Sequence, residues 1–149
     1  MVHRELVRRK LHLITEDLGR LLRFKEISLD ELTRDDLKLA AVERLLERIV
    51  MRAIDVNQHF ITELATGQEE TITRLTYRDT FLRLAELGAY PRDFAERISQ
   101  SAGLRNILVH GYNDVDHRIL HTAIRRCLQD YHRYVEQVSA FVTQFDEKQ

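Results

Sequence analysis

Four polar side chains that could act on a phosphate group lie close together in the stretch GLRNILVHGY, residues 103–112. Arg105 carries a permanent charge on a planar fork that matches phosphate oxygens. The imidazole of His110 can take up or release a proton near neutral pH. Asn106 and Tyr112 add groups that can hydrogen-bond to a substrate or to the histidine. Together these residue types predict chemistry on a phosphodiester.

Such a group could cut RNA without a metal ion. His110 would assist the attack of a ribose 2′-hydroxyl on its own phosphate, or protonate the leaving oxygen. Arg105 would stabilise the negative charge that builds up on the phosphorus oxygens. Asn106 could orient the histidine or the substrate, and Tyr112 could contact a base or a phosphate. The spacing alone is not specific, since an arginine and a histidine five residues apart occur by chance in many helical proteins.

Each of these residues also has a purely structural interpretation. His110 could be an ordinary histidine at a helix end, where the dipole favours its charged form. Tyr112 could be a half-buried ring with its hydroxyl in water. Arg105 could instead pair with one of the carboxylates near it in the sequence, those of Glu96, Asp114 and Asp116.

A helix that would position the four groups is predicted from Pro91 to about His110. Pro91 suits the first turn of a helix, and Asn106 shares a face with His110 because the two are four residues apart. Arg105 lies about 100° round the helix from Asn106, close enough for its guanidinium to fold over. The apolar residues 107–109 would anchor the other side in the core, leaving the polar groups to face a cleft or an interface.

Apolar residues at helical spacing extend over most of the remaining chain. A first stripe contains Leu6, Leu13, Ile14, Leu18, Leu21 and Leu22, and a second contains Leu37, Ala41, Leu45, Ile49, Ala53, Phe60 and Leu64. A third stripe runs from Ile119 to Phe145. Helix starts are predicted at three hydroxyl residues followed by an acidic residue three positions later, namely Ser28 with Glu31, Thr33 with Asp36, and Thr76 with Asp79. Gly67 and Gly88 predict helix ends, and GYNDVD (111–116) predicts a turn.

These elements predict an all-α fold, an antiparallel bundle of four to five helices with two long ones. The 149 residues, 44% hydrophobic and 32% charged, suit a single globular domain over 1–149. The net charge of −1 excludes attraction of nucleic acid by overall charge, so RNA binding would need a local patch or a site made by two subunits. The lone Cys127 and the lack of a signal peptide or an apolar span predict a cytoplasmic protein that makes no contact with membranes.

Other polar pairs have weaker functional interpretations. Asp55 and His59 share a helix face and could support a cleft, although a salt-linked surface pair is the simpler interpretation. His117 and His121 have metal-ligand spacing but no convincing third ligand nearby. Basic residues on the first and last helices could line an RNA-binding cleft or be solvated, and these are Arg4, Arg8, Arg9, Lys10, Arg125, Arg126 and Arg133.

The segment RNILVHGY resembles the R-x4-H-x-Y signature of HepT-like toxins, small helical ribonucleases of the HEPN superfamily. The similarity extends further: ERLLERIVMRAIDVNQHFI resembles the family's second long helix. The segment from TYRDTF to DHRIL also follows the family's later half, so nearly the whole chain is covered. Gly111 occupies a position that the family leaves variable.

The resemblance implies a HEPN-like homodimer in which two R-x4-H motifs face each other across a cleft. Arg105 and His110 would be the catalytic pair of a metal-independent endoribonuclease that needs no cofactor, with Asn106 and Tyr112 in supporting, substrate-binding roles. Tyr112 would be the tyrosine that a cognate minimal nucleotidyltransferase antitoxin modifies with AMP from ATP. The expected function is therefore the toxin of a type VII-like toxin–antitoxin system. The alternative is a non-catalytic HEPN module that binds and regulates a nucleotidyltransferase or a nucleotide.

Overall fold

The computed structural model describes residues 1–65, 74–104, 107–108 and 114–145, with the backbone alone for 114–116. These segments contain six α-helices, two 3₁₀ helices and no strand, which confirms the all-α prediction and adds to the predicted number of helices. The elements are α1 (Arg4–Leu21), η1 (Leu22–Phe24), α2 (Leu29–Arg34), α3 (Asp36–Leu64), α5 (Tyr77–Glu86), α6 (Arg92–Ser99), η2 (Gln100–Gly103) and α8 (Asp114–Val142).

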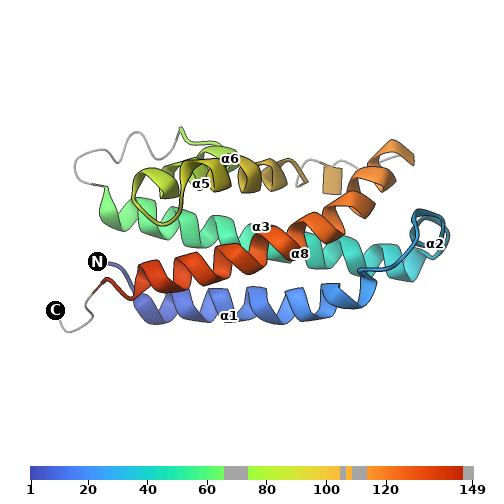
Figure 1. The fold of residues 1–149 in the computed structure, drawn as a ribbon, viewed down its shortest axis with the longest axis horizontal. Coiled ribbons are helices and arrows are strands. Elements are labelled where there is room, and N and C mark those ends of the chain that lie inside the picture. The colour runs from blue at the N-terminus through green and yellow to red at the C-terminus, as the bar shows by residue number, and fades with distance from the viewer. Residues whose placement is uncertain (66–73, 105–106, 109–113, 146–149) are drawn as a thin grey trace.

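Three helices form the main body of the bundle. Helix α1 packs against both α3 and α8, and Figure 1 shows that it runs in the opposite direction to these two. Helices α5 and α6 pack on each other, with α5 against α3 and α6 against α8, while the short α2 lies across one end. Helices α3 and α8 have 29 residues each. Within the described segments, no helix is apolar enough over sufficient length to cross a membrane.

Local capping interactions set several helix boundaries. The Thr76 hydroxyl and the Asp79 carboxylate cap each other's backbone amides, which confirms the capping box that starts α5. Gly88 adopts φ +99°, a left-handed conformation that glycine tolerates, and it follows the end of α5 as predicted. Ser28 caps α2 by accepting a hydrogen bond from the amide of Glu31.

The predicted start of the long helix α3 at Thr33 is wrong. The cap is Asp35, whose carboxylate accepts hydrogen bonds of 3.1 Å from the amides of Leu37 and Lys38. Thr33 belongs to α2, and its hydroxyl donates to the carbonyl of Leu29. A carboxylate on an extended residue can reach two free amides at a helix start, and here Asp35 does so directly before α3.

The apolar face of α1 is rotated from the predicted stripe. Its buried residues are Val7, Leu11, Ile14, Asp17 and Leu21. Leu6 and Leu22, both assigned to the stripe, are 45% and 56% exposed, and Leu37 at the start of α3 is 83% exposed. Leucines on both flanks of a stripe fit the same period, so the sequence could not tell which flank faces the core.

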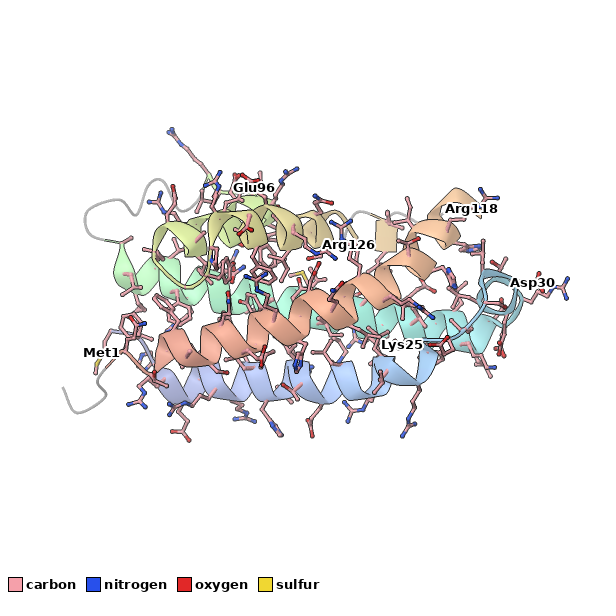
Figure 2. The ribbon with its side chains drawn as sticks, viewed as in Figure 1. Met1, Lys25, Asp30, Glu96, Arg118 and Arg126 are labelled. Carbon is pink, nitrogen blue, oxygen red and sulfur yellow. The ribbon has the colours of Figure 1, made fainter. Side chains whose placement is uncertain are left out.

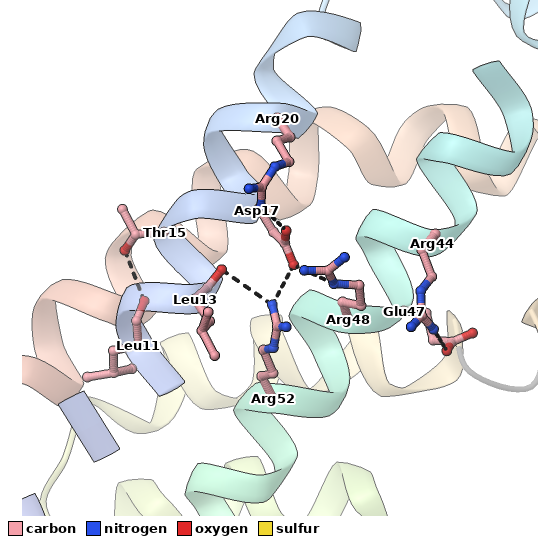
Figure 3. Close-up of polar contacts among 9 residues, drawn as sticks. All are labelled: Leu11, Leu13, Thr15, Asp17, Arg20, Arg44, Glu47, Arg48 and Arg52. Carbon is pink, nitrogen blue, oxygen red and sulfur yellow. Dashed lines mark hydrogen bonds and ion pairs between the residues drawn. The ribbon is translucent and has the colours of Figure 1, made fainter. Parts of the chain in front are cut away.

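A buried carboxylate joins α1 to α3 (Figure 3). The Asp17 side chain is 0% exposed and accepts 2.8 Å and 2.6 Å hydrogen bonds from Arg20 and Arg52. Arg48 Nε lies 3.1 Å from the same carboxylate. Three guanidinium groups therefore compensate one buried charge, and two of them come from the neighbouring helix.

Candidate functional site

The predicted site residues Arg105, Asn106, His110 and Tyr112 lie outside the described residues, as does Val109. The described residues among and beside them show how this part of the chain meets the core. Leu104 is 6% exposed, and Ile107 and Leu108 are half-buried and pack against the core. Two of the three apolar residues predicted to anchor the motif therefore do so.

The single helix predicted from Pro91 to His110 is wrong in its described part. Helix α6 ends at Ser99, and the 3₁₀ helix η2 follows. Hydroxyl groups at this junction donate to main-chain carbonyls three residues back, Ser99 to Glu96 at 2.8 Å and Ser101 to Ile98 at 2.7 Å. Serine side chains compete in this way for backbone partners. The predicted turn 111–116 is also too long, because α8 begins at Asp114.

Helix α8 holds the 3₁₀ helix in place through a buried hydroxyl pair. The Tyr131 phenol oxygen lies 2.7 Å from the Ser101 hydroxyl oxygen. Burial raises the pKa of Tyr131 well above its usual value, so the phenol keeps its proton. Because Ser101 donates to the Ile98 carbonyl, Tyr131 is the donor to Ser101. This contact ties the turn four residues before Arg105 to the middle of α8.

A groove of about 380 Å³ lies between η2 and the first half of α8. One wall belongs to the segment that leads directly into the motif and the other to α8, and the described lining residues are Gln100, Ser101, Leu104, Arg118, Ile119, Thr122, Ala123, Arg126, Cys127 and Asp130. Figure 2 shows Arg118 near the start of α8 and Arg126 further along it, beside η2. Leu104, the residue that precedes Arg105 in the sequence, is thus part of the groove lining.

Positive charge exceeds negative charge around this groove. Asp130, which is 5% exposed, lies 2.6 Å from Arg97 Nε and 3.8 Å from Arg126 Nε. Arg126 also donates to the Gln100 side chain at 2.7 Å. Two arginines therefore share one carboxylate, and the exposed Arg118 adds a third cation. Arg97, Arg126 and Arg118 against Asp130 leave a surplus of two positive charges among these described residues.

The thiol of Cys127 in the groove floor is unreactive. Its side chain is buried, and burial raises the pKa of Cys127 to about 12. A thiol with that pKa is protonated at neutral pH and is a poor nucleophile. The groove therefore offers hydrogen-bonding, charged and apolar groups, and its cysteine contributes only packing.

The weaker candidates from the sequence have structural partners. Asp55 pairs with Lys10 at 3.3 Å, which agrees with the salt-linked surface interpretation. His59 Nε2 accepts a 3.0 Å hydrogen bond from the amide of His3. His121 Nε2 lies 2.6 Å from the carbonyl oxygen of Ile27, where it joins α8 to the segment before α2.

The core residue Asn57 links three helices through hydrogen bonds. Its amide donates to Thr80 Oγ1 at 3.1 Å, and its carbonyl oxygen accepts from the Tyr134 hydroxyl at 2.6 Å. All three side chains are buried.

Two of the basic residues singled out in the sequence on the last helix have structural partners. Arg125 pairs with Glu26, and Arg133 lies over the Phe94 ring. Of that set only Arg126 lines the groove.

Comparison with known proteins identifies the family. The family described as ribonuclease HepT-like matches residues 14–138. The tRNA nuclease HepT of Aphanizomenon flos-aquae is 33% identical over 143 residues, which cover 96% of this chain and 94% of that protein. The chain belongs to the HepT-like ribonuclease family. This confirms the family predicted from the R-x4-H-x-Y motif, and with it the enzyme class, a ribonuclease.

Another sequence relative and two solved structures are also similar to this chain. The mRNA nuclease HepT of Shewanella oneidensis is 24% identical over 95 residues, covering 64% of this chain and 68% of that protein. A solved toxin–antitoxin with AMP-PNP has a TM-score of 0.75 at 20% identity, over 91% of this chain and 98% of its own. The tri-AMPylated S. oneidensis HEPN toxin in complex with MNT antitoxin has a TM-score of 0.73 at 21% identity, over 91% and 97% of the two chains. The helical arrangement is therefore HEPN-like.

The lining of the groove was not predicted, although part of its signal was present in the sequence. Arg118, Thr122 and Arg126 follow one another at four-residue spacing and so share a face of α8. Gln100 and Leu104 precede the motif in the sequence, whereas these residues of α8 follow it. Only the fold shows that this stripe meets η2.

Proposed function

We propose that this HepT-like ribonuclease cleaves cellular RNA as a metal-independent endonuclease and that Arg105 and His110 are its catalytic pair. The observation that carries the proposal is the family match over residues 14–138, which spans an intact R-x4-H-x-Y motif. The 33% identical tRNA nuclease supports RNA as the substrate class. The two motif residues are those whose chemistry suits cleavage at a phosphate.

The roles of the two residues follow from their charges. His110 would take the proton from the 2′-hydroxyl as it attacks the neighbouring phosphorus, or give a proton to the departing 5′-oxygen. Arg105 cannot lose its charge and would stabilise the negative charge on the non-bridging oxygens in the transition state. Asn106 would orient the imidazole or the substrate. The reaction would leave a cyclic phosphate on one fragment and a 5′-hydroxyl on the other.

We further propose that one HepT-like domain over residues 1–149 acts as a homodimer with its two motifs facing one cleft. The net charge of −1 supports a shared site, since a single chain has little overall attraction for RNA. Two subunits would bring two copies each of Arg105 and His110 to one strand.

The proposed control is AMPylation of Tyr112 by a cognate nucleotidyltransferase antitoxin that uses ATP. The complex of tri-AMPylated S. oneidensis toxin with MNT antitoxin, which has the same fold, supports this partner. AMP on the Tyr112 hydroxyl would place a phosphate and a nucleoside two residues from His110. The adduct would compete with RNA for Arg105 by charge and exclude it by volume.

The deciding experiment compares the wild type with His110→Ala. Induced without any antitoxin, the wild type should arrest growth and, when purified, cut RNA in the presence of a chelator. His110→Ala should do neither while it keeps the thermal midpoint of the wild type. A wild type that leaves growth and RNA unchanged would instead point to the non-catalytic module.

A further inference from the structure

The groove between η2 and α8 has an apolar floor and a charged rim. Leu104, Ala123 and Cys127 are between 3% and 7% exposed and form the floor. Ile119 is 41% exposed and continues this apolar surface along α8. Gln100, Thr122 and Arg118 supply polar groups around it. An apolar surface with a few polar groups at its edge is the usual form of a small-ligand site.

The size and charge of the groove suit one nucleotide. A volume of about 380 Å³ lies at the small end of the range for ligand pockets. The surplus of positive charge from Arg97, Arg118 and Arg126 over Asp130 would attract a phosphate. Arg126 is already held by Gln100 and Asp130, whereas the exposed Arg118 forms no ion pair with an acidic residue among the described residues. Arg118 is therefore the better phosphate ligand.

The position of the groove assigns its occupant. Leu104, in the groove floor, is joined by one peptide bond to Arg105, and consecutive Cα atoms are about 3.8 Å apart. We therefore expect an RNA strand with a phosphate at Arg105 to place a neighbouring nucleotide at the groove. The floor is apolar and Arg118 is charged, and apolar and ionic contacts of this kind hold a nucleotide with little preference for its base.

We propose that this groove binds the RNA nucleotide adjacent to the scissile phosphate, with its base or ribose against Leu104, Ile119 and Ala123 and a phosphate on Arg118. The proposal rests on the ribonuclease function and adds substrate-binding residues to it. Thr122 lines the groove, and a longer, negatively charged side chain at this position would exclude the strand.

The test measures binding of a short, fluorescently labelled single-stranded RNA to protein carrying His110→Ala, which prevents cleavage. Thr122→Glu should weaken binding about tenfold and Arg118→Gln about fivefold. Arg118→Gln should also lower the slope of log Kd against log salt by about 0.7, the loss of one phosphate contact on a single strand. In the otherwise wild-type enzyme, both changes should raise KM more than they lower kcat.

Two matched controls make the same changes in charge elsewhere on the surface. Arg92→Gln alters an exposed arginine on α6 that pairs with Glu96, and Ala140→Glu adds a carboxylate to an exposed position further along α8. Both should leave RNA affinity within twofold of the parent. Equal weakening in the controls and the groove variants would overturn the proposal, because the effect would then follow from net charge alone.

A separate arm tests the second source of a nucleotide, the AMP carried by Tyr112. If the groove held that adduct in place of RNA, Thr122→Glu would reduce any thermal stabilisation gained on AMPylation and leave RNA affinity unchanged, which would refute the assignment. If the wild type cleaves RNA but the Thr122→Glu and Arg118→Gln variants bind RNA normally, only this inference is refuted. If the wild type has no nuclease activity, the proposed function itself is refuted.

Discussion

The Ser101 hydroxyl oxygen and the Tyr131 phenol oxygen lie 2.7 Å apart, and this contact joins the 3₁₀ helix before the motif to the centre of α8. Tyr131 is 0% exposed, so water cannot replace Ser101 as the hydrogen-bond partner of its hydroxyl. The segment that enters the R-x4-H motif is thus held by a buried polar contact as well as by the packing of Leu104. We therefore expect Tyr131 to act as a positioning residue for Arg105, the proposed catalytic arginine.

Replacing Tyr131 with Phe should lower kcat for RNA cleavage several-fold. The change removes one buried hydrogen bond, which typically contributes about 1 kcal/mol, and leaves the ring in the core. Ser101→Ala should lower kcat similarly, and the double variant should be no worse than either single one. The measurement is a double-mutant cycle in kcat well below the thermal midpoints. Additive effects would show that the two hydroxyls act independently and contradict the positioning role.

Local signals predicted the parts of the fold that depend on a few neighbouring residues. The capping box of Thr76 and Asp79 was found because its two partners are three residues apart. The prediction that α3 starts at Thr33 failed because the carboxylate of Asp35 is better placed to cap the same helix start. The continuous helix predicted from Pro91 is interrupted at Gln100–Gly103, before the motif, because the hydroxyls of Ser99 and Ser101 bind backbone carbonyls and the turn tightens to 3₁₀. Such competition is decided by geometry that a spacing rule does not contain.

The catalytic residues were proposed from residue chemistry and a family signature, whereas the groove needed the fold. Arg105 and His110 stand five residues apart in one stretch of sequence. Gln100 and Arg126, which form one hydrogen bond in the groove, are 26 residues apart and come from different helices. Asp17 illustrates the same limit, because its partner Arg52 lies 35 residues away. A buried aspartate on an apolar stripe gives no sign of the arginines that compensate it.

Asp17→Asn should destabilise the protein by about 3 kcal/mol. The carboxylate is fully buried, and its loss would leave the guanidinium of Arg52, only 20% exposed, without its counter-charge. Arg20→Gln should lower the free energy of unfolding by less than about 1 kcal/mol, because Arg20 is 53% exposed and water can replace its contact with Asp17. Urea unfolding at constant m-value gives both numbers. Equal losses for the two variants would contradict the buried-charge explanation.

A fall in pH should lower the stability of the folded protein, partly through protonation of His59. Burial lowers the pKa of His59, the neighbouring Glu63 opposes this shift, and His3 and the N-terminal amine add to it. The unfolded chain therefore binds a proton at His59 more readily than the folded one, so this residue's contribution to stability falls as pH drops through its ordinary pKa of about 6.5. Protonation would also remove the Nε2 acceptor used by the His3 amide.

The matched variant for this effect is His59→Gln, which keeps a hydrogen-bond acceptor without a titrating ring. The loss of unfolding free energy between about pH 7.5 and about pH 5.5 should be smaller in the variant than in the wild type. Comparing the two differences cancels the contributions of the other six histidines. An identical loss in both proteins would show that the histidine is not a source of the acid sensitivity.

Tyr112→Phe should separate RNA cleavage from its control by the antitoxin. The phenylalanine keeps the ring but removes the hydroxyl oxygen that would form the bond to the AMP phosphorus, so no adduct can form at this position. Cleavage of RNA by the purified variant should stay within about threefold of the wild type if the hydroxyl has only a supporting role in substrate binding.

The measurement incubates each protein with the nucleotidyltransferase and ATP, follows the mass increase of one AMP or more, and then assays RNA cleavage. Wild type should gain mass and lose activity, because the added phosphate and nucleoside would compete with RNA for Arg105. Tyr112→Phe should keep both its mass and its activity, and its induction should arrest growth even when the antitoxin is co-expressed. Silencing of the variant together with a mass increase would place the modified hydroxyl elsewhere. Silencing without any mass increase would mean that the antitoxin inhibits by binding alone.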